Sequence, residues 1–310
     1  MAISASDVKA LREKTGAGMM DCKKALEDTN GDFEEAAKLI KERGLAVVAK
    51  KADRITADGL VDILYDENSN TAVMIEVNTE TDFVAKNESF QNFVRGCLKV
   101  ILKEKPATVQ ELLSKPFSDD SGNMVDGALN ELVMQIKENM TVRRFAIAEG
   151  NLSVYVHNKG AIGVIVKVEA DEKVLADAGF AEFKKNIALQ IASMNPDYIA
   201  KEDVPASAIE EEKEKIIAEI KEDEANAKKP ENVIEKMVEG KIRKYYANKC
   251  LMEQDYIKED KMSVAGYISE YKNKAGGEVK IAEFYRFEKG EGIQKREDDF
   301  AEEIAKLTRK

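Results

Sequence analysis

The side chains best placed to do chemistry in this sequence are Asp82 and Phe83, which stand together within residues 81–87. Thr81 precedes the pair and Val84 follows it. Alternating apolar residues come before this segment and a helical apolar pattern comes after it, so the pair lies on a strand-to-helix connection. Binding groups concentrate on connections held by rigid elements. We therefore expect a binding role, while the alternative that the phenylalanine packs onto its own domain stays open.

Catalysis finds little support among the other polar residues. His157 is the only histidine, so a multi-histidine metal site is excluded; its place in a predicted hairpin turn suits either a solvated residue or a partner contact. The carboxylates at 210–212 and 298–299 fall in charged helical runs, which are usually solvated. Asp82 as a metal ligand lacks a second carboxylate in register. We expect no catalytic residue, no metal and no cofactor.

A second candidate contact surface surrounds Met19 and Met20. Adjacent residues at a helix start cannot both face inward, so one methionine should pack in the core and the other should be exposed. Arg12 and Lys23 would flank the exposed side chain as a charged rim. The alternative is that both methionines lie in an irregular core turn.

The elements that position these residues begin with an N-terminal module at residues 1–50. Capping and turn residues at 4–7, 30–31 and 32–35 predict three short helices, with Asp21 as the N-cap of the second. A charged hinge at 50–54 follows, after which the apolar period changes from 3.6 to 2. Residues 59–65 and 71–77 predict a β-hairpin and residues 90–102 a helix, within a first core unit at 55–150.

The same order of elements returns in a second core unit at 151–204 and 251–292. Strands are expected at 152–156, 162–168 and 280–288, and a helix at 180–192. Phe90 and Phe93 match Phe180 and Phe183 at a constant offset, which indicates an internal duplication. The second unit has different residues at 171–175, where the first has the Asp82–Phe83 segment. That difference favours a specialised use for the segment over a scaffold requirement.

Two helical segments complete the predicted α+β fold, in which a duplicated antiparallel-sheet core carries covering helices. Residues 205–250 predict two antiparallel helices, interrupted near Pro230, that form an inserted hairpin. This hairpin is either a solvated insertion or a contact surface. Residues 293–310 predict a C-terminal helical module, with an amphipathic helix at 298–307.

Composition limits the class of partner. The net charge of −11 argues against mainly electrostatic binding to nucleic acid. Three cysteines without a CxxC pair indicate neither a disulfide framework nor a zinc site and suit a reducing cytoplasm. No export signal is evident, and no segment approaches the roughly 18 apolar residues of a membrane span. We expect a cytoplasmic protein with a protein partner and no direct nucleic-acid or membrane binding; its oligomeric state stays open.

Two segments resemble the signatures of one family, bacterial-type elongation factor Ts. The first is residues 76–87, which include the Asp82–Phe83 segment, and the second is residues 11–26, which include both methionines. Further similarity runs through 142–144, 162–164, 236–240 and 287–292, so the resemblance spans the whole chain.

The resemblance implies a guanine-nucleotide exchange factor for elongation factor Tu, bound in its GDP and nucleotide-free forms, that disturbs the partner's Mg²⁺ and phosphate site. It also implies a ubiquitin-associated-like fold for the N-terminal module. Carried onto this sequence, it implies the following partner-binding residues: Arg12, Met19, Met20, Lys23, Thr81, Asp82, Phe83, Val84, His157, Tyr256 and Ile257. Lys258 departs from the family pattern beside the last two. The alternatives from other classes are an adaptor of the ubiquitin-associated type without exchange activity and a hydrolase acting through carboxylates.

Overall fold

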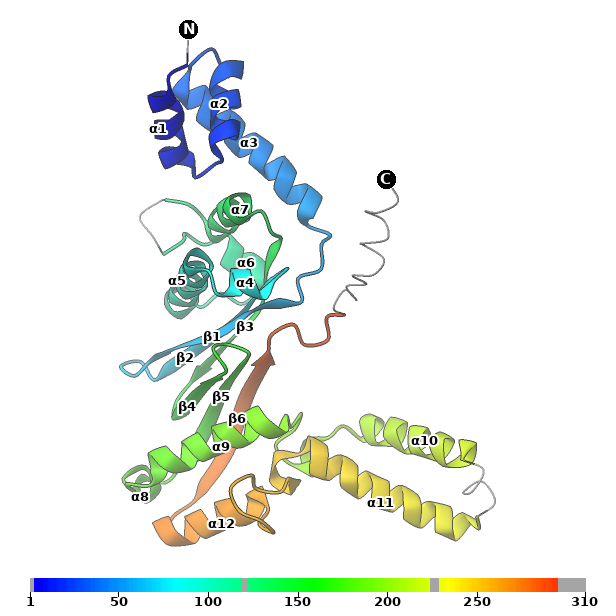
Figure 1. Ribbon diagram of the computed structural model, residues 1–310. Coiled ribbons are helices and arrows are strands. Elements are labelled where there is room, and N and C mark those ends of the chain that lie inside the picture. Colours follow the sequence, from blue (N-terminus) through cyan, green and yellow to red (C-terminus); the bar gives the residue numbers. More distant parts are fainter. Residues whose placement is uncertain (1–2, 119–121, 224–228, 295–310) are drawn as a thin grey trace.

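The computed structural model describes residues 3–118, 122–223 and 229–294 (Figure 1). Helices combine with two small antiparallel sheets, which confirms the predicted α+β class. The helix predicted at 298–307 lies outside the described residues.

Three helices form the N-terminal module: α1 (Ala5–Thr15), α2 (Met19–Asp28) and α3 (Phe33–Lys51). Ser4 and Asp7 form the predicted capping box, and the Asp32 side chain caps α3. The prediction that Asp21 caps α2 is wrong, because the helix begins two residues earlier and Gly18 is its N-cap. The small core of the module consists of Val8, Leu11, Cys22, Ala25, Leu26, Ala36 and Ile40.

α3 carries the module onto the rest of the chain. It packs on α7 (Val125–Ile136), and a Cβ atom on Gly44 would lie only 1.5 Å from Met134 Sδ. The expected hinge is shorter than predicted, because α3 continues to Lys51. The Asn139 side chain then donates hydrogen bonds to the carbonyl groups of residues 52 and 54, at 3.2 and 2.9 Å. The module is therefore docked on the core and not tethered by a free linker.

The first sheet has the strand order β1–β2–β3, with β1 (Asp58–Asp66), β2 (Thr71–Thr79) and β3 (Met140–Glu149). β2 is buried along its whole length. One face of the sheet is covered by α4 (Asp82–Ala85), α5 (Glu88–Glu104), α6 (Val109–Leu113) and α7 (Figure 1). β3 was not predicted from the sequence, because the adjacent Arg143 and Arg144 interrupt its apolar alternation.

The second sheet repeats this arrangement as β4–β5–β6, with β4 (Leu152–His157), β5 (Ile162–Ala170) and β6 (Val279–Glu288). Its covering helices are α8 (Glu172–Leu175), α9 (Phe180–Met194) and α12 (Val264–Ala275), with two 3₁₀ turns, η1 (Lys201–Asp203) and η2 (Leu251–Glu253). The strand register shifts between residues 76 and 77 in the first sheet and between residues 167 and 168 in the second. These matching irregularities confirm the duplicated core.

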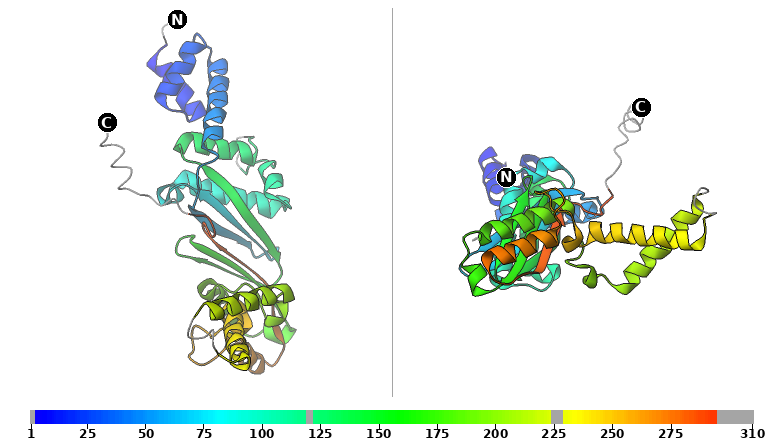
Figure 2. Two further views of the ribbon diagram at one scale, coloured as in Figure 1. Left: turned by 90° about the vertical axis from the view of Figure 1, so that its right-hand side faces the viewer. Right: turned by 90° about the horizontal axis from the view of Figure 1, so that it is seen from below.

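The two sheets stack face to face, so the core has four layers in the order helices, sheet, sheet, helices (Figures 1 and 2). The sheets approach closely at Gly163, where a Cβ atom would lie 2.6 Å from Val61 Cγ1 and 2.8 Å from Met74 Sδ. Side chains between the sheets form one cluster, which consists of Val61, Ala72, Met74, Ala146, Ala148, Leu152, Ile165 and Phe287.

The inserted hairpin consists of α10 (Ala206–Glu222) and α11 (Glu231–Lys249), which extend away from the core (Figure 2). Ile216 and Ile220 of α10 pack with Val238 and Ile242 of α11 in a cluster separate from the core clusters. The two helices thus bury their apolar residues mainly against each other.

Candidate functional site

Asp82 and Phe83 lie on α4, a single helical turn in the strand-to-helix connection. Phe83 is 78% exposed, whereas Val84 and Ala85 are buried in the first-unit core. The alternative that Phe83 packs onto its own domain is therefore wrong. Asp82 accepts a hydrogen bond from Lys86 Nζ at 2.5 Å, and the same amine lies 5.7 Å from the centroid of the Phe83 ring.

The charge of Asp82 follows from that contact. The hydrogen bond from Lys86 lowers the pKa of the Asp82 carboxyl below its usual value. The carboxylate is therefore ionised at neutral pH and cannot act as a general acid there. α4 offers a partner an anion beside an exposed apolar ring.

The matching helix of the second unit shows what is particular to α4. α8 also stands between a central strand and a long helix, and Val174 is buried on it as Val84 is on α4. The position of Phe83 is taken on α8 by the exposed Lys173. Because the two helices share a buried anchor and differ in the outward side chain, the scaffold does not require an aromatic residue at position 83.

Thr81 and Val84 are engaged within the chain. Val84 is 6% exposed. The backbone N–H and the hydroxyl of Thr81 both donate to the carboxylate of Glu138, at 3.0 and 2.8 Å. Asp82 and Phe83 are thus the outward-facing members of the predicted set in this segment.

The methionine surface of the N-terminal module is larger than predicted. Met19 is 44% exposed and Met20 is 74% exposed, so the prediction that one of them packs in the core is wrong, as is the alternative that both do. The physical reason is that Cys22, one turn further along α2, fills the core. Arg12 and Lys23 are exposed on α1 and α2. Two adjacent, flexible thioether side chains make an adaptable apolar patch.

His157 is exposed at the end of β4, and its Nδ1 lies 2.8 Å from the hydroxyl of Tyr155. The turn after it is fixed to the first sheet, since the Val61 N–H donates to the Gly160 carbonyl at 2.9 Å. β1, which contains Val61, also packs against α4. The turn that follows His157 and α4 therefore both adjoin β1.

Tyr256 and Ile257 lie in the loop before α12. α12 belongs to the opposite outer layer of the core from α4 (Figure 1). Tyr256 is 6% exposed and stacks on Tyr267 with ring centroids 4.3 Å apart. Ile257 is 42% exposed, and its N–H donates to Gln190 Oε1 at 2.9 Å. Lys258 is held by a 2.6 Å hydrogen bond to an asparagine of α9. In this loop, Tyr256 is an internal anchor and Ile257 faces outward.

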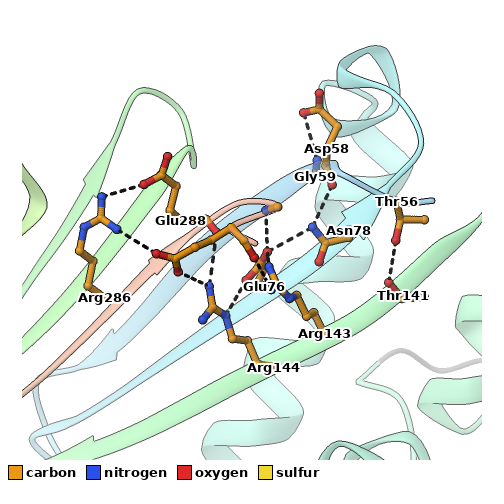
Figure 3. A network of polar contacts seen from close by, with 12 residues as sticks. Thr56, Asp58, Gly59, Glu76, Asn78, Thr141, Arg143, Arg144, Arg286 and Glu288 are labelled. Carbon is orange, nitrogen blue, oxygen red and sulfur yellow. Dashed lines mark hydrogen bonds and ion pairs between the residues drawn. The ribbon is translucent and has the colours of Figure 1, made fainter. Parts of the chain in front are cut away.

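Sequence reasoning missed a buried polar network that joins the two units (Figure 3). Glu76 of β2 is fully buried and accepts hydrogen bonds from Arg143 Nη1 at 2.9 Å, Arg144 Nε at 2.6 Å and the Gly290 N–H at 2.8 Å. Arg143 is the extra residue of a β-bulge opposite Glu76, so two consecutive arginines reach one carboxylate. A glutamate inside an apolar strand was the sequence signal that could have indicated this network.

The segment after β6 closes the network from the second unit. Gly290 has φ of 69°, and a Cβ atom there would lie 2.1 Å from the carbonyl oxygen of Ala57, so only glycine fits. Arg144 Nη2 also lies 3.1 Å from Glu291 Oε2, and its guanidinium stands 4.2 Å from the Phe287 ring centroid. Residues 287–292, noted above for their family resemblance, therefore hold the two units together beside the first sheet.

The described parts of the chain offer little for covalent or metal chemistry. Cys22, Cys97 and Cys250 are free and buried, and burial raises the pKa of the Cys250 thiol to about 11. Across residues 3–118, 122–223 and 229–294, no group of three or more His, Cys, Asp or Glu residues could hold a metal ion. No helix in these ranges is both long enough and apolar enough to cross a membrane. What the candidate surface offers is binding through exposed apolar side chains next to charges.

Comparison with known proteins agrees with the resemblance. A family model described as "Elongation factor TS" matches residues 80–291. The elongation factor Ts of Clostridium botulinum (strain Eklund 17B / Type B) is 44% identical over 307 residues, covering 98% of each chain. Those of Clostridium perfringens (strain 13 / Type A) and Trichlorobacter lovleyi are 42% and 40% identical and cover 98–99% of both chains. With nearly its whole length matched at this identity, the chain belongs to the elongation factor Ts family.

Proposed function

We propose that this chain is the guanine-nucleotide exchange factor of elongation factor Tu, acting in the cytoplasm during translation elongation. It binds the GDP form of its partner, speeds the release of GDP and stays on the nucleotide-free form until GTP loads. Family membership supports the identity of the partner. The observation that carries the mechanism is the 78% exposure of Phe83 on a helical turn whose next two residues are buried.

The proposed mechanism is a wedge. A GTPase holds GDP through a phosphate loop and a Mg²⁺ ion that bridges protein and phosphate oxygens. Phe83 inserts between partner elements near that site and displaces them. Mg²⁺ demands near-ideal octahedral geometry, so a small displacement weakens its binding strongly. A loss of ~4 kcal/mol of nucleotide affinity corresponds to about a thousandfold.

Asp82 assists Phe83 by exchanging its ion-pair partner within the chain for a group on the GTPase. In the free chain its carboxylate is paired with Lys86, which is itself an exposed surface residue. Because the pair is exposed to solvent, it contributes little to stability, and releasing it costs little. Asp82 can then accept hydrogen bonds from a donor or a helix N-terminus of the GTPase.

The N-terminal module supplies affinity. Met19 and Met20 give it an adaptable apolar patch, with Arg12 and Lys23 as charged neighbours, that docks on a helix of the GTPase domain. Because α3 packs on α7, the module is presented in a fixed direction relative to α4. His157 and Ile257 contribute further contacts, and Tyr256 supports Ile257 from within.

A nucleotide-release assay tests this proposal. Purified elongation factor Tu carrying a fluorescent GDP analogue is mixed with excess unlabelled GDP and increasing amounts of the chain. We expect release to accelerate and saturate. An adaptor without exchange activity would form a complex without changing the release rate, and a hydrolase would produce a new reaction product. Lys173→Ala, which removes the α8 side chain at the position of Phe83, is the matched control and should behave as the unaltered chain.

A further inference from the structure

We propose that Glu138 is a positioning residue for nucleotide exchange: its carboxylate fixes the start of α4 and so sets the direction in which Asp82 and Phe83 face the partner. The proposal rests on the proposed function, and in it Glu138 acts through α4 and not through a contact of its own with the GTPase.

Within the described residues, the hydrogen bonds that the Glu138 carboxylate accepts lie at the two ends of the β2–α4 connection. Its Oε2 accepts hydrogen bonds from the Thr79 hydroxyl at 3.2 Å and from the Thr81 N–H at 3.0 Å, and its Oε1 accepts from the Thr81 hydroxyl at 2.8 Å. Thr79 is the last residue of β2, and Thr81 is the N-cap of α4. A single carboxylate thus fixes both the exit from the strand and the entry into the helix.

α4 needs this external support. An N-cap threonine normally accepts a hydrogen bond from the first turn of its helix, but the Thr81 side chain makes no such bond. A helix of four residues cannot be stable by itself, because the cost of forming the first turn exceeds the return from so few hydrogen bonds. The direction of Phe83 therefore depends on two anchors, the buried side chains of residues 84 and 85 and the carboxylate of Glu138.

The neighbours of Glu138 tie the same segment to the N-terminal module. Lys137 Nζ lies 3.8 Å from Asp21 Oδ2 of the module. The Asn139 N–H donates to Glu80 Oε1 at 2.6 Å. The Asn139 side chain donates to the carbonyl groups of residues 52 and 54, in the segment that connects α3 to β1. Residues 137–139 thus hold α4, the segment between α3 and β1, and the N-terminal module together.

The second unit contains an equivalent tie that carries no aromatic residue. Asp171, the N-cap of α8, accepts a hydrogen bond from the Glu278 N–H at 2.8 Å, and its own N–H donates to the Glu278 carbonyl at 3.0 Å. Glu278 stands just before β6, as Glu138 stands just before β3. Anchoring the short helix is therefore a property of the scaffold, and only in the first unit does the anchored helix present a phenylalanine.

The test compares Glu138→Ala, Glu138→Gln and the matched control Asp171→Ala. For each full-length variant, the maximal rate of stimulated GDP release, the half-saturating concentration and the melting temperature are measured. We expect Glu138→Ala to lower the maximal rate about tenfold, the factor for the net loss of roughly one hydrogen bond to a charged group. Asp171→Ala should lower the melting temperature about as much as Glu138→Ala does, and it should leave the maximal rate unchanged.

Glu138→Gln should restore most of the rate. The Gln oxygen can accept from the Thr81 N–H and the Thr79 hydroxyl, and the Thr81 hydroxyl can rotate to accept from the Gln amide group. If Glu138→Ala fails to fold, Thr81→Val removes one of the same hydrogen bonds and should lower the maximal rate by a smaller factor. A normal maximal rate for whichever of these two variants is folded would overturn the inference.

A double variant separates positioning from a direct effect. In a Phe83→Ala background, Glu138→Ala should cause a much smaller further loss of maximal rate, since only the weaker Asp82 contact remains to be positioned on α4. A full additional tenfold loss would mean that Glu138 acts independently of α4. If the unaltered chain fails to accelerate release, the proposed function itself fails; if it succeeds and only the Glu138 results disagree, the inference fails alone.

Discussion

Phe83→Ala removes the proposed wedge with little else, because Phe83 projects from α4 and is 78% exposed in the free chain. A phenylalanine buries about 200 Å² when enclosed, so roughly 150 Å² of Phe83 remains available to a partner. At about 25 cal/mol per Å², burying that area contributes roughly 4 kcal/mol, less the share of the Cβ atom that alanine keeps. Truncating a buried aromatic anchor typically costs about 2–4 kcal/mol.

These magnitudes predict that stimulated GDP release by Phe83→Ala slows about ten- to a thousandfold. Binding to nucleotide-free partner should fall less, because interactions made only as nucleotide leaves appear in the rate. Asp82→Ala should do less than Phe83→Ala. The melting temperature should barely change, because the Phe83 ring makes a cation–π contact with the exposed Lys86 in the free chain, and such a contact contributes about 0.5–1 kcal/mol.

Stopped-flow release of a fluorescent GDP analogue, measured beside a melting curve, separates the outcomes. Normal release by Phe83→Ala would refute the wedge. A slow rate accompanied by a large fall in melting temperature would refute the account of Phe83 as an outward-facing contact residue. Lys173→Ala on α8 serves as the control for a substitution on a short covering helix.

Four further predictions concern other parts of the chain. Deleting residues 1–50 should weaken complex formation in a pull-down or titration while the core keeps a cooperative melt; undiminished binding and exchange would contradict the affinity role of the module. Replacing residues 205–250 by a short Gly/Ser linker should leave a cooperative thermal transition, since the hairpin buries its apolar side chains mainly within itself, whereas an insoluble product would show that it completes the core. His157→Gln should keep most exchange activity, and its complete loss with intact binding would indicate proton chemistry. Glu76→Gln should lower the free energy of unfolding by about 3 kcal/mol, the lower end for a broken buried pair, because both arginines reach solvent; an unchanged denaturation midpoint would contradict the role of Glu76 in holding the two units together.

Periodic elements could be predicted from the sequence because burial on one side imposes a period. Val73, Ile75 and Val77 alternate on β2 and pack in the core under the covering helices. Phe90 and Phe93 lie on one face of α5 at helical spacing. Their matches at 180 and 183 predicted α9.

The parts that could not be predicted depend on contacts between distant residues. β3 was not predicted because the bulge at Arg143 interrupts the alternation of buried and exposed residues along the strand. The bulge places two arginines on one carboxylate, a contact that no local sequence period indicates. Both methionines of α2 are exposed because Cys22 fills the core, and the volume of a core is not visible in a local pattern. Glu138 is 57 residues from Thr81, so only the folded chain brings this carboxylate to the start of α4.

The central claim, that this chain and GDP oppose each other on elongation factor Tu, is tested most directly by measuring both affinities in one titration series. A factor that weakens nucleotide binding must itself be weakened by nucleotide in the same ratio. We expect the GDP dissociation constant to rise about a thousandfold at saturating chain, and the dissociation constant of the chain to rise by the same factor at saturating GDP. Equal binding of the chain to the GDP-bound and nucleotide-free forms would contradict the account.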